Sequence, residues 1–202
     1  MIIEERSRKF IDAAMAEIAK RKGVVLDVGG GERFTKWLAR YKEELKSCDY
    51  KTFDYDASTS ADIVGDIHKI PIIDEYCDAV ICASVLEHVR DPLTAMSELR
   101  RILKKGGRIF LYVPSTYPYH ARIGHYPDYW RFFEDTMREI LFEEFSAVQI
   151  HKRGGYFLAL TFFVPMQHRF RWFLNPLANF LDRVFRTDKR TTTAGYYVLA
   201  VK

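Results

Sequence analysis

Short apolar runs alternate with segments of helical periodicity along most of this chain. Seven runs have the length and composition of buried strands, and they lie at 24–28, 50–53, 63–64, 79–83, 108–113, 148–151 and 196–201. Apolar residues recur at helical spacing at 10–18, 34–41, 93–103 and 132–141. Strands that alternate with helices through short links predict an α/β fold: a doubly wound, mostly parallel, seven-stranded sheet with helices on both faces.

Capping residues predict where three of the helices begin or end. Ser7 precedes the first helical segment and Gly23 follows it, so residues 1–23 are expected to form an N-terminal helix. Gly106 and Gly107 are expected to stop the helix that begins near Leu93. Farther on, Asn175 as N-cap and Pro176 in the first turn predict the start of another helix.

Composition narrows the class of protein. The chain is 48% hydrophobic and 29% charged, which is typical of a globular protein, and 202 residues favour a single domain over 1–202. No window reaches the roughly 18 apolar residues of a membrane span, and the first ten residues lack the apolar region of a secretory signal. With three cysteines at no recognisable spacing, a cytoplasmic protein with reduced thiols is expected.

Charge and ligand spacing set further expectations. The net charge is only +4, so a nucleic-acid partner is not expected. The sequence shows no clustering of His and Cys at metal-ligand spacing, so no metal is expected either.

A run of three glycines follows the first predicted strand, within Asp27-Val28-Gly29-Gly30-Gly31-Glu32-Arg33-Phe34. Glycines let the backbone turn sharply and approach a ligand closely. Phe34 stands where a dinucleotide fingerprint needs its third glycine, and Glu32 would repel a pyrophosphate at the start of the following helix. The loop therefore suits a ligand without phosphates, and a purely structural strand–helix turn stays open as the alternative.

Acidic residues follow the next two predicted strands. Asp54 ends the second strand, where a carboxylate can accept both hydroxyls of a ribose. Asp66 follows the third strand and can accept from an adenine amino group. Each aspartate alone is more often a turn residue than a ligand contact. Because the carboxyl ends of parallel strands meet at one edge of a sheet, the glycine loop and both aspartates together predict a nucleoside-like ligand.

These motifs resemble those of the class I S-adenosylmethionine-dependent methyltransferases, in particular the small type 11 group. The resemblance covers about 24–113. It is carried by Leu26 to Gly31, by Asp54, by Gly65-Asp66-Ile67, and by Ser84-Val85-Leu86-Glu87-His88-Val89 with the segment 99–107 behind it. Such a resemblance implies a Rossmann-like fold and an enzyme that uses S-adenosylmethionine and releases S-adenosylhomocysteine.

The resemblance also implies roles for individual residues. Asp27 would orient the glycine loop and reach the methionine amino group, directly or through water. Gly29 and Gly31, with Gly30 between them, would line the methionine part of the cofactor, and Asp54 would hold the ribose hydroxyls. The remaining implied cofactor contacts are Tyr55 beside the adenine, Asp66 and Ile67 at the adenine edge, and Ser84 beneath the sulfonium.

The segment after the fifth predicted strand, within 112–133, is rich in aromatic residues and is long for an inert loop. It is expected to bind the acceptor, a small molecule or a glycan- or lipid-linked molecule that is methylated on oxygen or nitrogen. The candidate acceptor-binding residues are Tyr117, Tyr119, Tyr126, Tyr129 and Arg131. Where the acceptor must lose a proton, the candidate bases are His88, His120 and His125, although His88 has an alternative role as a hydrogen-bonding support of the loop.

A helical and aromatic insertion at 154–190 is expected before the last strand. From 168 to 190 it holds six Lys or Arg and two Asp, a net charge of +4. Two interpretations stay open: a lid or homodimer interface, and a peripheral membrane contact through 156–186. Two alternatives to a methyltransferase also stay open, a catalytically silent methyltransferase-like assembly subunit and an NAD-linked oxidoreductase.

Overall fold

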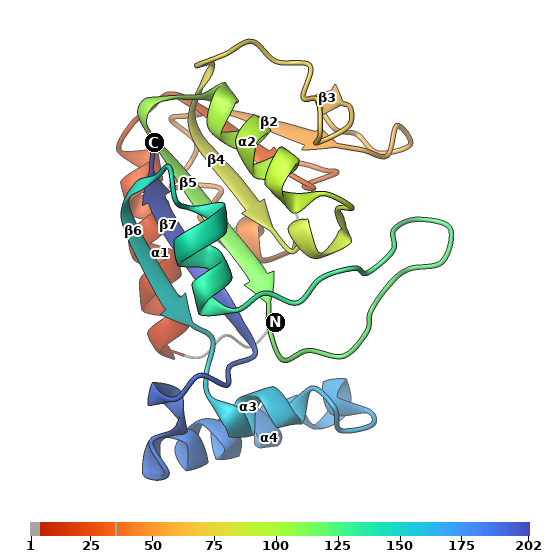
Figure 1. Ribbon diagram of the computed structural model, residues 1–202, viewed down its shortest axis with the longest axis vertical. Coiled ribbons are helices and arrows are strands. Elements are labelled where there is room, and N and C mark those ends of the chain that lie inside the picture. Colours follow the sequence, from red (N-terminus) through yellow and green to blue (C-terminus); the bar gives the residue numbers. More distant parts are fainter. Residues whose placement is uncertain (1–4, 35) are drawn as a thin grey trace.

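A computed structural model describes residues 5–34 and 36–202, and a seven-stranded sheet runs through it (Figure 1). Its strands are β1 (Val24–Val28), β2 (Asp49–Asp54), β3 (Ile63–Val64), β4 (Cys77–Ala83), β5 (Leu103–Pro114), β6 (Ser146–Lys152) and β7 (Gly195–Val201). Their order is β3-β2-β1-β4-β5-β7-β6, and β7 runs antiparallel to both of its neighbours. The sheet is otherwise parallel, which confirms the Rossmann-like, doubly wound fold.

Helices cover both faces of the sheet. The α-helices are α1 (Glu5–Ala19), α2 (Pro92–Ile102), α3 (Tyr156–Thr161) and α4 (Gln167–Val184). Shorter helical turns are η1 (Lys36–Tyr41), η2 (Leu86–His88), the π-helical η3 (Thr136–Leu141) and η4 (Thr187–Lys189). Figure 1 shows α1 behind the sheet and α2 in front of it, while α3 and α4 lie side by side beyond the end of the sheet.

The side chains of the central strands point alternately into two hydrophobic cores. Along β5, Ile109 and Leu111 pack into the core beneath α2, whereas Phe110 and Tyr112 pack into the core beneath α1. Strand β7 alternates in the same way. Because both faces are buried, these strands read as continuous apolar runs in the sequence.

The order of the strands reverses at β1, which pairs with β2 on one side and with β4 on the other. The connections leaving β1 and β4 diverge from this point. In sheets of this type, such a divergence opens a crevice at the carboxyl ends of the strands. The predicted ligand-binding residues after β1, β2 and β4 therefore lie at the same edge of the sheet.

One predicted helix is much reduced. The expectation was a helix at 34–41 directly after the glycine loop, but the structure has only the six-residue 3₁₀ turn η1, which begins at Lys36. Phe34 adopts a left-handed φ of 54° and stacks on Tyr50, with ring centroids 4.0 Å apart. Aromatic stacking therefore fixes the chain where helix N–H groups were expected. Thr35 of the predicted segment lies outside the described residues.

The two N-cap predictions, Ser7 and Asn175, are also wrong. Ser7 is fully buried inside α1, where its hydroxyl lies 3.2 Å from Nε2 of His151, and α1 ends at Ala19 rather than at Gly23. Helix α4 already begins at Gln167 and contains Pro176 in its interior. A proline inside a helix costs about 3 kcal/mol, so tertiary packing must offset it. Asn175 and Ala178 are buried and supply part of that packing.

A buried carboxylate joins the two helices of the insertion. Asp182, which is 2% exposed, accepts hydrogen bonds from the backbone N–H groups of Gly155, Phe157 and Leu158 at 2.8–3.1 Å. It also accepts from the hydroxyl of Thr187 at 2.5 Å. The carboxylate thus satisfies the free N–H groups at the start of α3 from a position on α4.

We expect Asp182→Ala to lower the free energy of unfolding by at least about 3 kcal/mol, because several buried donors lose their acceptor at once. Urea denaturation followed by circular dichroism measures the change. As a matched control, replacing the exposed Glu143 with alanine should change stability by less than about 0.5 kcal/mol. Equal stability of the two variants would show that Asp182 does not hold the insertion together.

Candidate functional site

The glycine loop folds back over the end of β1. Gly29 and Gly31 have left-handed φ values of 74° and 57°, which favour glycine. The N–H of Gly29 donates to the carbonyl of Phe53 at 2.8 Å, which ties the loop to the end of β2. A Cβ on Gly30 would lie 2.4 Å from Oδ2 of Asp27, so the loop backbone sits directly against this carboxylate.

Asp27 itself is 4% exposed and accepts a 2.6 Å hydrogen bond from the hydroxyl of Tyr50. Burial and the neighbouring carboxylate both raise the pKa of Tyr50 well above its usual value. The phenol therefore stays protonated and fixes the Asp27 carboxylate at the base of the loop. This arrangement fits the predicted role of Asp27 in orienting the glycine loop.

Other predicted cofactor contacts lie around the same edge. Asp54 is half-buried at the end of β2, and its Oδ1 accepts a hydrogen bond from the N–H of Asp56 at 3.0 Å. Its Oδ2 faces Gly31, because a Cβ built on that glycine would lie 3.5 Å from this oxygen. Tyr55, next in the chain, is 76% exposed. Ser84 directly follows β4 with a left-handed φ of 59°, and its N–H donates to the carbonyl of Tyr112. The structure thus brings Gly31 and Asp54 close together and leaves the face of Tyr55 free.

The third predicted acid lies near β3. Oδ1 of Asp66 accepts from the N–H of His68 at 2.9 Å and lies 2.6 Å from Nδ1 of the same histidine. The backbone N–H of His68 lowers the pKa of Asp66, so the carboxylate is ionised at neutral pH. The side chain of Ile67 is buried in the core, which leaves its backbone as the part available to an adenine edge.

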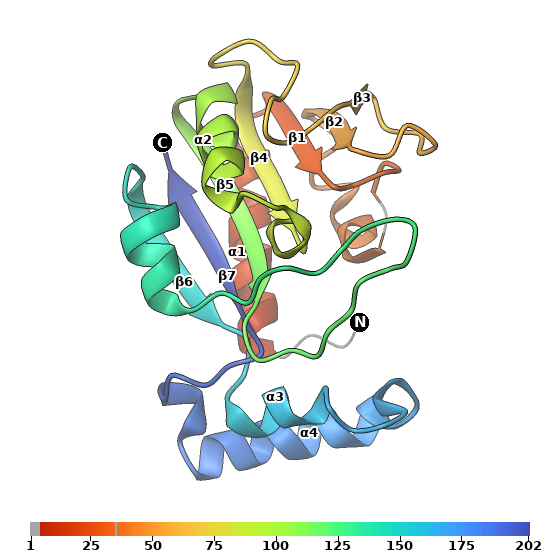
Figure 2. The same cartoon turned by 45° about the vertical axis from the view of Figure 1, so that its right-hand side comes forward.

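The acceptor loop, defined here as residues 115–131, extends outward from the end of β5 (Figure 2). Arg131 holds its two ends together. The guanidinium of Arg131 donates to the carbonyls of Tyr117 and Pro118 at 2.9 and 2.8 Å and to both oxygens of Asp128 at 2.6 and 2.7 Å. Arg131, a predicted acceptor-binding residue, therefore organises the loop from within.

Asp128 is the buried partner in this network. Burial works to raise its pKa, but hydrogen bonds from Arg131 and from the N–H of His120 outweigh burial and lower the pKa to about 2. The far end of the loop is fixed to η2, because the N–H of Tyr129 donates to the carbonyl of Glu87 at 2.7 Å. The indole of Trp130 donates to the carbonyl of Val89 at 2.8 Å.

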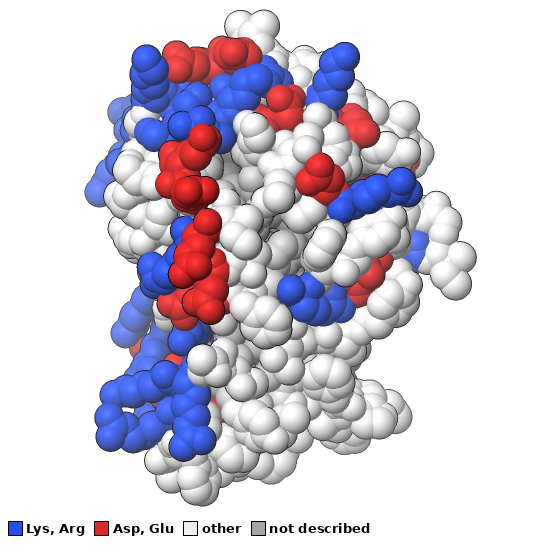
Figure 3. All heavy atoms as spheres, viewed as in Figure 1, with Lys and Arg blue, Asp and Glu red and all other residues white. Residues whose placement is uncertain are grey.

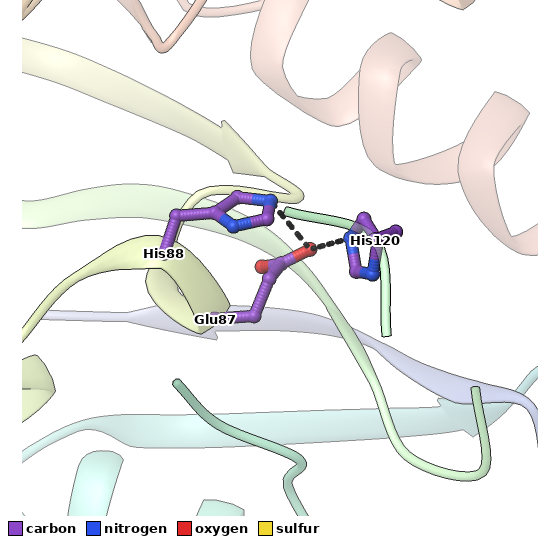
Figure 4. Close-up of side chains that lie close together, drawn as sticks. All are labelled: Glu87, His88 and His120. Atoms are coloured by element: carbon purple, nitrogen blue, oxygen red, sulfur yellow. Dashed lines mark ion pairs between the residues drawn. The ribbon is translucent and has the colours of Figure 1, made fainter. Parts of the chain in front are cut away.

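Two of the three predicted bases meet in the structure. Figure 4 shows Glu87 of η2 pointing between the rings of His88 and His120. Oε1 of Glu87 lies 3.9 Å from Nε2 of His88 and 3.8 Å from Nε2 of His120. The nearby Glu87 carboxylate raises the pKa of His120. His125 lies apart from this group, with its Nδ1 4.0 Å from a carboxylate oxygen of Asp56.

The predicted acceptor tyrosines divide into two sets. Tyr117 and Tyr126 pack against the histidine pair, with ring centroids 5.1 Å from His120 and 4.4 Å from His88, respectively. Tyr119 is 77% exposed and Tyr129 is about half exposed, so neither is held by such packing. Tyr117 also contacts Phe162, just after α3, at 4.8 Å between centroids, which links the acceptor loop to the insertion.

Sequence reasoning gave no site role to Glu87, Asp128 or Arg153. Glu87 stands in the same motif as His88, but its 1% exposure becomes visible only in the fold. Arg153 is 7% exposed, donates to the hydroxyl of Tyr112 at 2.7 Å and lies over the ring of Phe162. The pairing of a distant arginine with a strand tyrosine has no local sequence pattern.

Because Arg131 pins the acceptor loop, we expect Arg131→Ala to speed amide hydrogen exchange in the peptide 117–130 by at least about tenfold. Each charge-assisted hydrogen bond that the variant loses contributes about 1.5–3 kcal/mol to the free energy of local opening of the loop. Mass-spectrometric exchange measures this, and Arg122→Ala, which changes an exposed arginine of the same loop, is the matched control. The same exchange rate in both variants would contradict a pinned loop.

Comparisons with known proteins agree with the fold. Residues 26–111 match the model of a family described as "Methyltransferase domain". The demethylmenaquinone methyltransferase of Thermotoga maritima is 28% identical over 116 residues, which are 55% of this chain and 45% of that protein. The ubiquinone/menaquinone biosynthesis C-methyltransferase of Caulobacter vibrioides is 33% identical over 122 residues, 50% of this chain and 48% of that protein.

Solved structures show the same architecture. A SAM-dependent methyltransferase from Archaeoglobus fulgidus superposes with a TM-score of 0.63 at 17% identity, covering 98% of this chain and 91% of that one. Phosphoethanolamine N-methyltransferase 2 of Haemonchus contortus, in complex with S-adenosyl-L-methionine, superposes with a TM-score of 0.55 at 14% identity. The alignment covers 94% of this chain and 52% of that one. These identities show the fold alone, and the chain spans less than half the length of the two curated relatives described above.

Proposed function

We propose that this protein is a class I S-adenosylmethionine-dependent methyltransferase of the type 11 group. The match of residues 26–111 to the methyltransferase family model and the fold shared with solved methyltransferases support this proposal. We propose that it transfers a methyl group to a hydroxyl-bearing, lipid-linked acceptor, on oxygen or on a ring carbon conjugated to it. The observation that carries the proposal is the position of the acceptor loop, between the cofactor edge of the sheet and an insertion with an exposed apolar surface.

The residues at the carboxyl ends of the strands fit S-adenosylmethionine. Gly30 presents bare backbone above the buried carboxylate of Asp27, which suits the ammonium group of a methionine. The Asp54 carboxylate next to Gly31 is half-buried and suits a pair of ribose hydroxyls. The exposed ring of Tyr55 offers a face to an adenine, and Asp66 offers an acceptor to its amino group.

S-adenosylmethionine supplies the activated methyl group, so the chain has to align the acceptor and exclude water. Pinned by Arg131, the acceptor loop provides the alignment. An acceptor hydroxyl must lose its proton before or during methyl transfer. His120 lies beside a buried carboxylate and a tyrosine, and it is the candidate base in this position.

The insertion supports an apolar acceptor. Helix α4 carries an exposed apolar stripe at helical spacing, made of Phe173, Leu177, Phe180 and Val184. In Figure 3 the surface over α3 and the first part of α4 is largely free of charge, and a basic group gathers beside it toward the end of α4. An uncharged surface flanked by arginines is the arrangement of a helix that lies in an anionic membrane interface.

Two further findings bear on the acceptor. No helix among the described residues is long and apolar enough to cross a bilayer. The relatives named above include enzymes whose names refer to demethylmenaquinone and to ubiquinone or menaquinone biosynthesis. We therefore propose that the stripe on α4 rests on the membrane and that the acceptor reaches the loop from there.

Asp54→Ala should weaken binding of S-adenosylmethionine by roughly tenfold to a hundredfold, because a charged acceptor of hydrogen bonds contributes about 1.5–3 kcal/mol. Isothermal titration calorimetry measures the affinity. Asp49→Ala changes an exposed aspartate at the opposite end of the same strand and should leave affinity unchanged. An unchanged affinity in folded Asp54→Ala protein would remove Asp54 from the cofactor site.

We expect the protein to sediment with phosphatidylglycerol vesicles at low salt and to be released by salt. Each basic residue near an anionic surface contributes about 1 kcal/mol. The double variant Phe173→Ser, Phe180→Ser should bind roughly a hundredfold more weakly or worse, since each buried phenylalanine contributes about 1.5–3 kcal/mol.

The matched control is Ile140→Ser, which removes an exposed apolar side chain of η3, away from the stripe. Gel filtration of the same proteins detects the competing role of the stripe. The membrane proposal is wrong if the parent protein does not bind vesicles and is a dimer while the double variant is a monomer. The stripe is then a homodimer interface.

A further inference from the structure

We propose that Glu87, His88 and His120 bind one first-row divalent transition-metal ion, with Zn²⁺ as the probe that tests it. The site lies where the acceptor loop crosses η2. The binding itself is independent of the proposed function, whereas the role of the ion toward an acceptor, given below, rests on that function.

The ligand atoms have the required separation. One carboxylate oxygen of Glu87 and one ring nitrogen of each histidine all lie within 4.8 Å of one another, and the two distances from Oε1 of Glu87 are 3.8 and 3.9 Å. Tetrahedral zinc with bonds of about 2.0–2.1 Å needs ligands roughly 3.3–3.5 Å apart. Small side-chain rotations therefore bring the three atoms into one coordination sphere (Figure 4).

Both rings are oriented as metal ligands usually are. Nδ1 of His88 lies 2.5 Å from the carbonyl of Pro127, and a carbonyl can only accept, so Nδ1 carries the proton and Nε2 presents a lone pair. Nδ1 of His120 lies 3.2 Å from the carbonyl of Pro118 and 3.1 Å from a carboxylate oxygen of Asp128. A carbonyl or carboxylate on the far nitrogen of a histidine is the usual outer support of a metal ligand.

The carboxylate has an incomplete set of partners. Glu87 is 1% exposed, and its Oε2 is buried without a hydrogen-bond partner among the described residues. A buried carboxylate is costly unless it is paired or coordinates a cation. Here the Nε2 atoms of His88 and His120 both face Oε1 of Glu87, and a cation can bind all three groups at once.

The ligand set selects the class of ion. Two imidazoles and one carboxylate suit zinc and its first-row neighbours, whereas magnesium and calcium prefer oxygen ligands. The side chains of His88 and His120 remain 13% and 30% exposed, so the cluster is accessible from outside. Three protein ligands with an accessible further position are typical of catalytic rather than structural zinc sites.

Such an ion has a use next to the acceptor loop. A divalent cation withdraws charge from a hydroxyl that binds it and eases the loss of the proton to solvent. The oxygen keeps the electron pair of the O–H bond, so it, or a ring carbon conjugated to it, becomes the nucleophile. His88 and His120 would then act as ligands in place of the proton-accepting role proposed above for His120.

The test is calorimetric titration of Zn²⁺ into the chelator-stripped full chain, with S-adenosylmethionine titrated separately. We expect one Zn²⁺ per chain and negligible heat with Mg²⁺. Glu87→Gln and His120→Ala should each weaken Zn²⁺ binding by about a hundredfold or more, beyond the tenfold to hundredfold of a lost supporting residue. His125→Ala removes another histidine of the acceptor loop and should bind Zn²⁺ like the parent protein.

Spectroscopy provides a second test in case substitution of the buried Glu87 prevents folding. Co²⁺ bound by the parent protein should give visible absorption bands that His120→Ala, a change of a partly exposed side chain, abolishes. The metal site is refuted if Zn²⁺ fails to bind stoichiometrically, or if Glu87→Gln and His120→Ala bind it like the parent. Because cofactor binding is measured separately, retained S-adenosylmethionine affinity in that case would leave the proposed function standing.

Discussion

The reversal of strand order at β1 is the constraint on which the rest of the site depends. β1 pairs with β2 and with β4, so the connections that leave β1 and β4 must diverge. The glycine loop, Asp54 and Ser84 border the resulting crevice because each follows a strand that ends there. Left-handed backbone conformations at Gly29, Gly31 and Ser84 then shape the turns that follow β1 and β4.

Three buried aspartates stabilise the loops and helices around this edge of the sheet. Tyr50 fixes the Asp27 carboxylate against the glycine loop, and Asp128 accepts from Arg131, which pins the acceptor loop. Asp182 joins the helices of the insertion in a similar way. Each carboxylate is surrounded by donors, as burial of a charge requires. Glu87 is the exception: its Oε2 has no hydrogen-bond partner among the described residues, and its Oε1 faces the two histidines of the proposed metal site.

The sequence predicted the sheet and the order of the elements well, because both cores of the sheet leave continuous apolar runs in its strands. It predicted helix boundaries poorly where tertiary contacts outweigh local preference. Pro176 is tolerated inside α4, and Phe34 leaves the helical region to stack on Tyr50. The contact between Glu87 and His120 could not be predicted, because no local sequence pattern relates a residue of η2 to a residue of a long loop. The motif after β4 contained Glu87, but its burial appears only in the fold.

The central claim is that the crevice at β1 and β4 binds S-adenosylmethionine. Calorimetric titration of the unmodified protein with S-adenosylmethionine, S-adenosylhomocysteine and NAD⁺ tests it most directly, because it asks which ligand the glycine loop accepts without assuming an acceptor. The account predicts binding of one molecule of either adenosyl compound per chain and no binding of NAD⁺, since Glu32 opposes a pyrophosphate. Binding of NAD⁺ without binding of either adenosyl compound would contradict it.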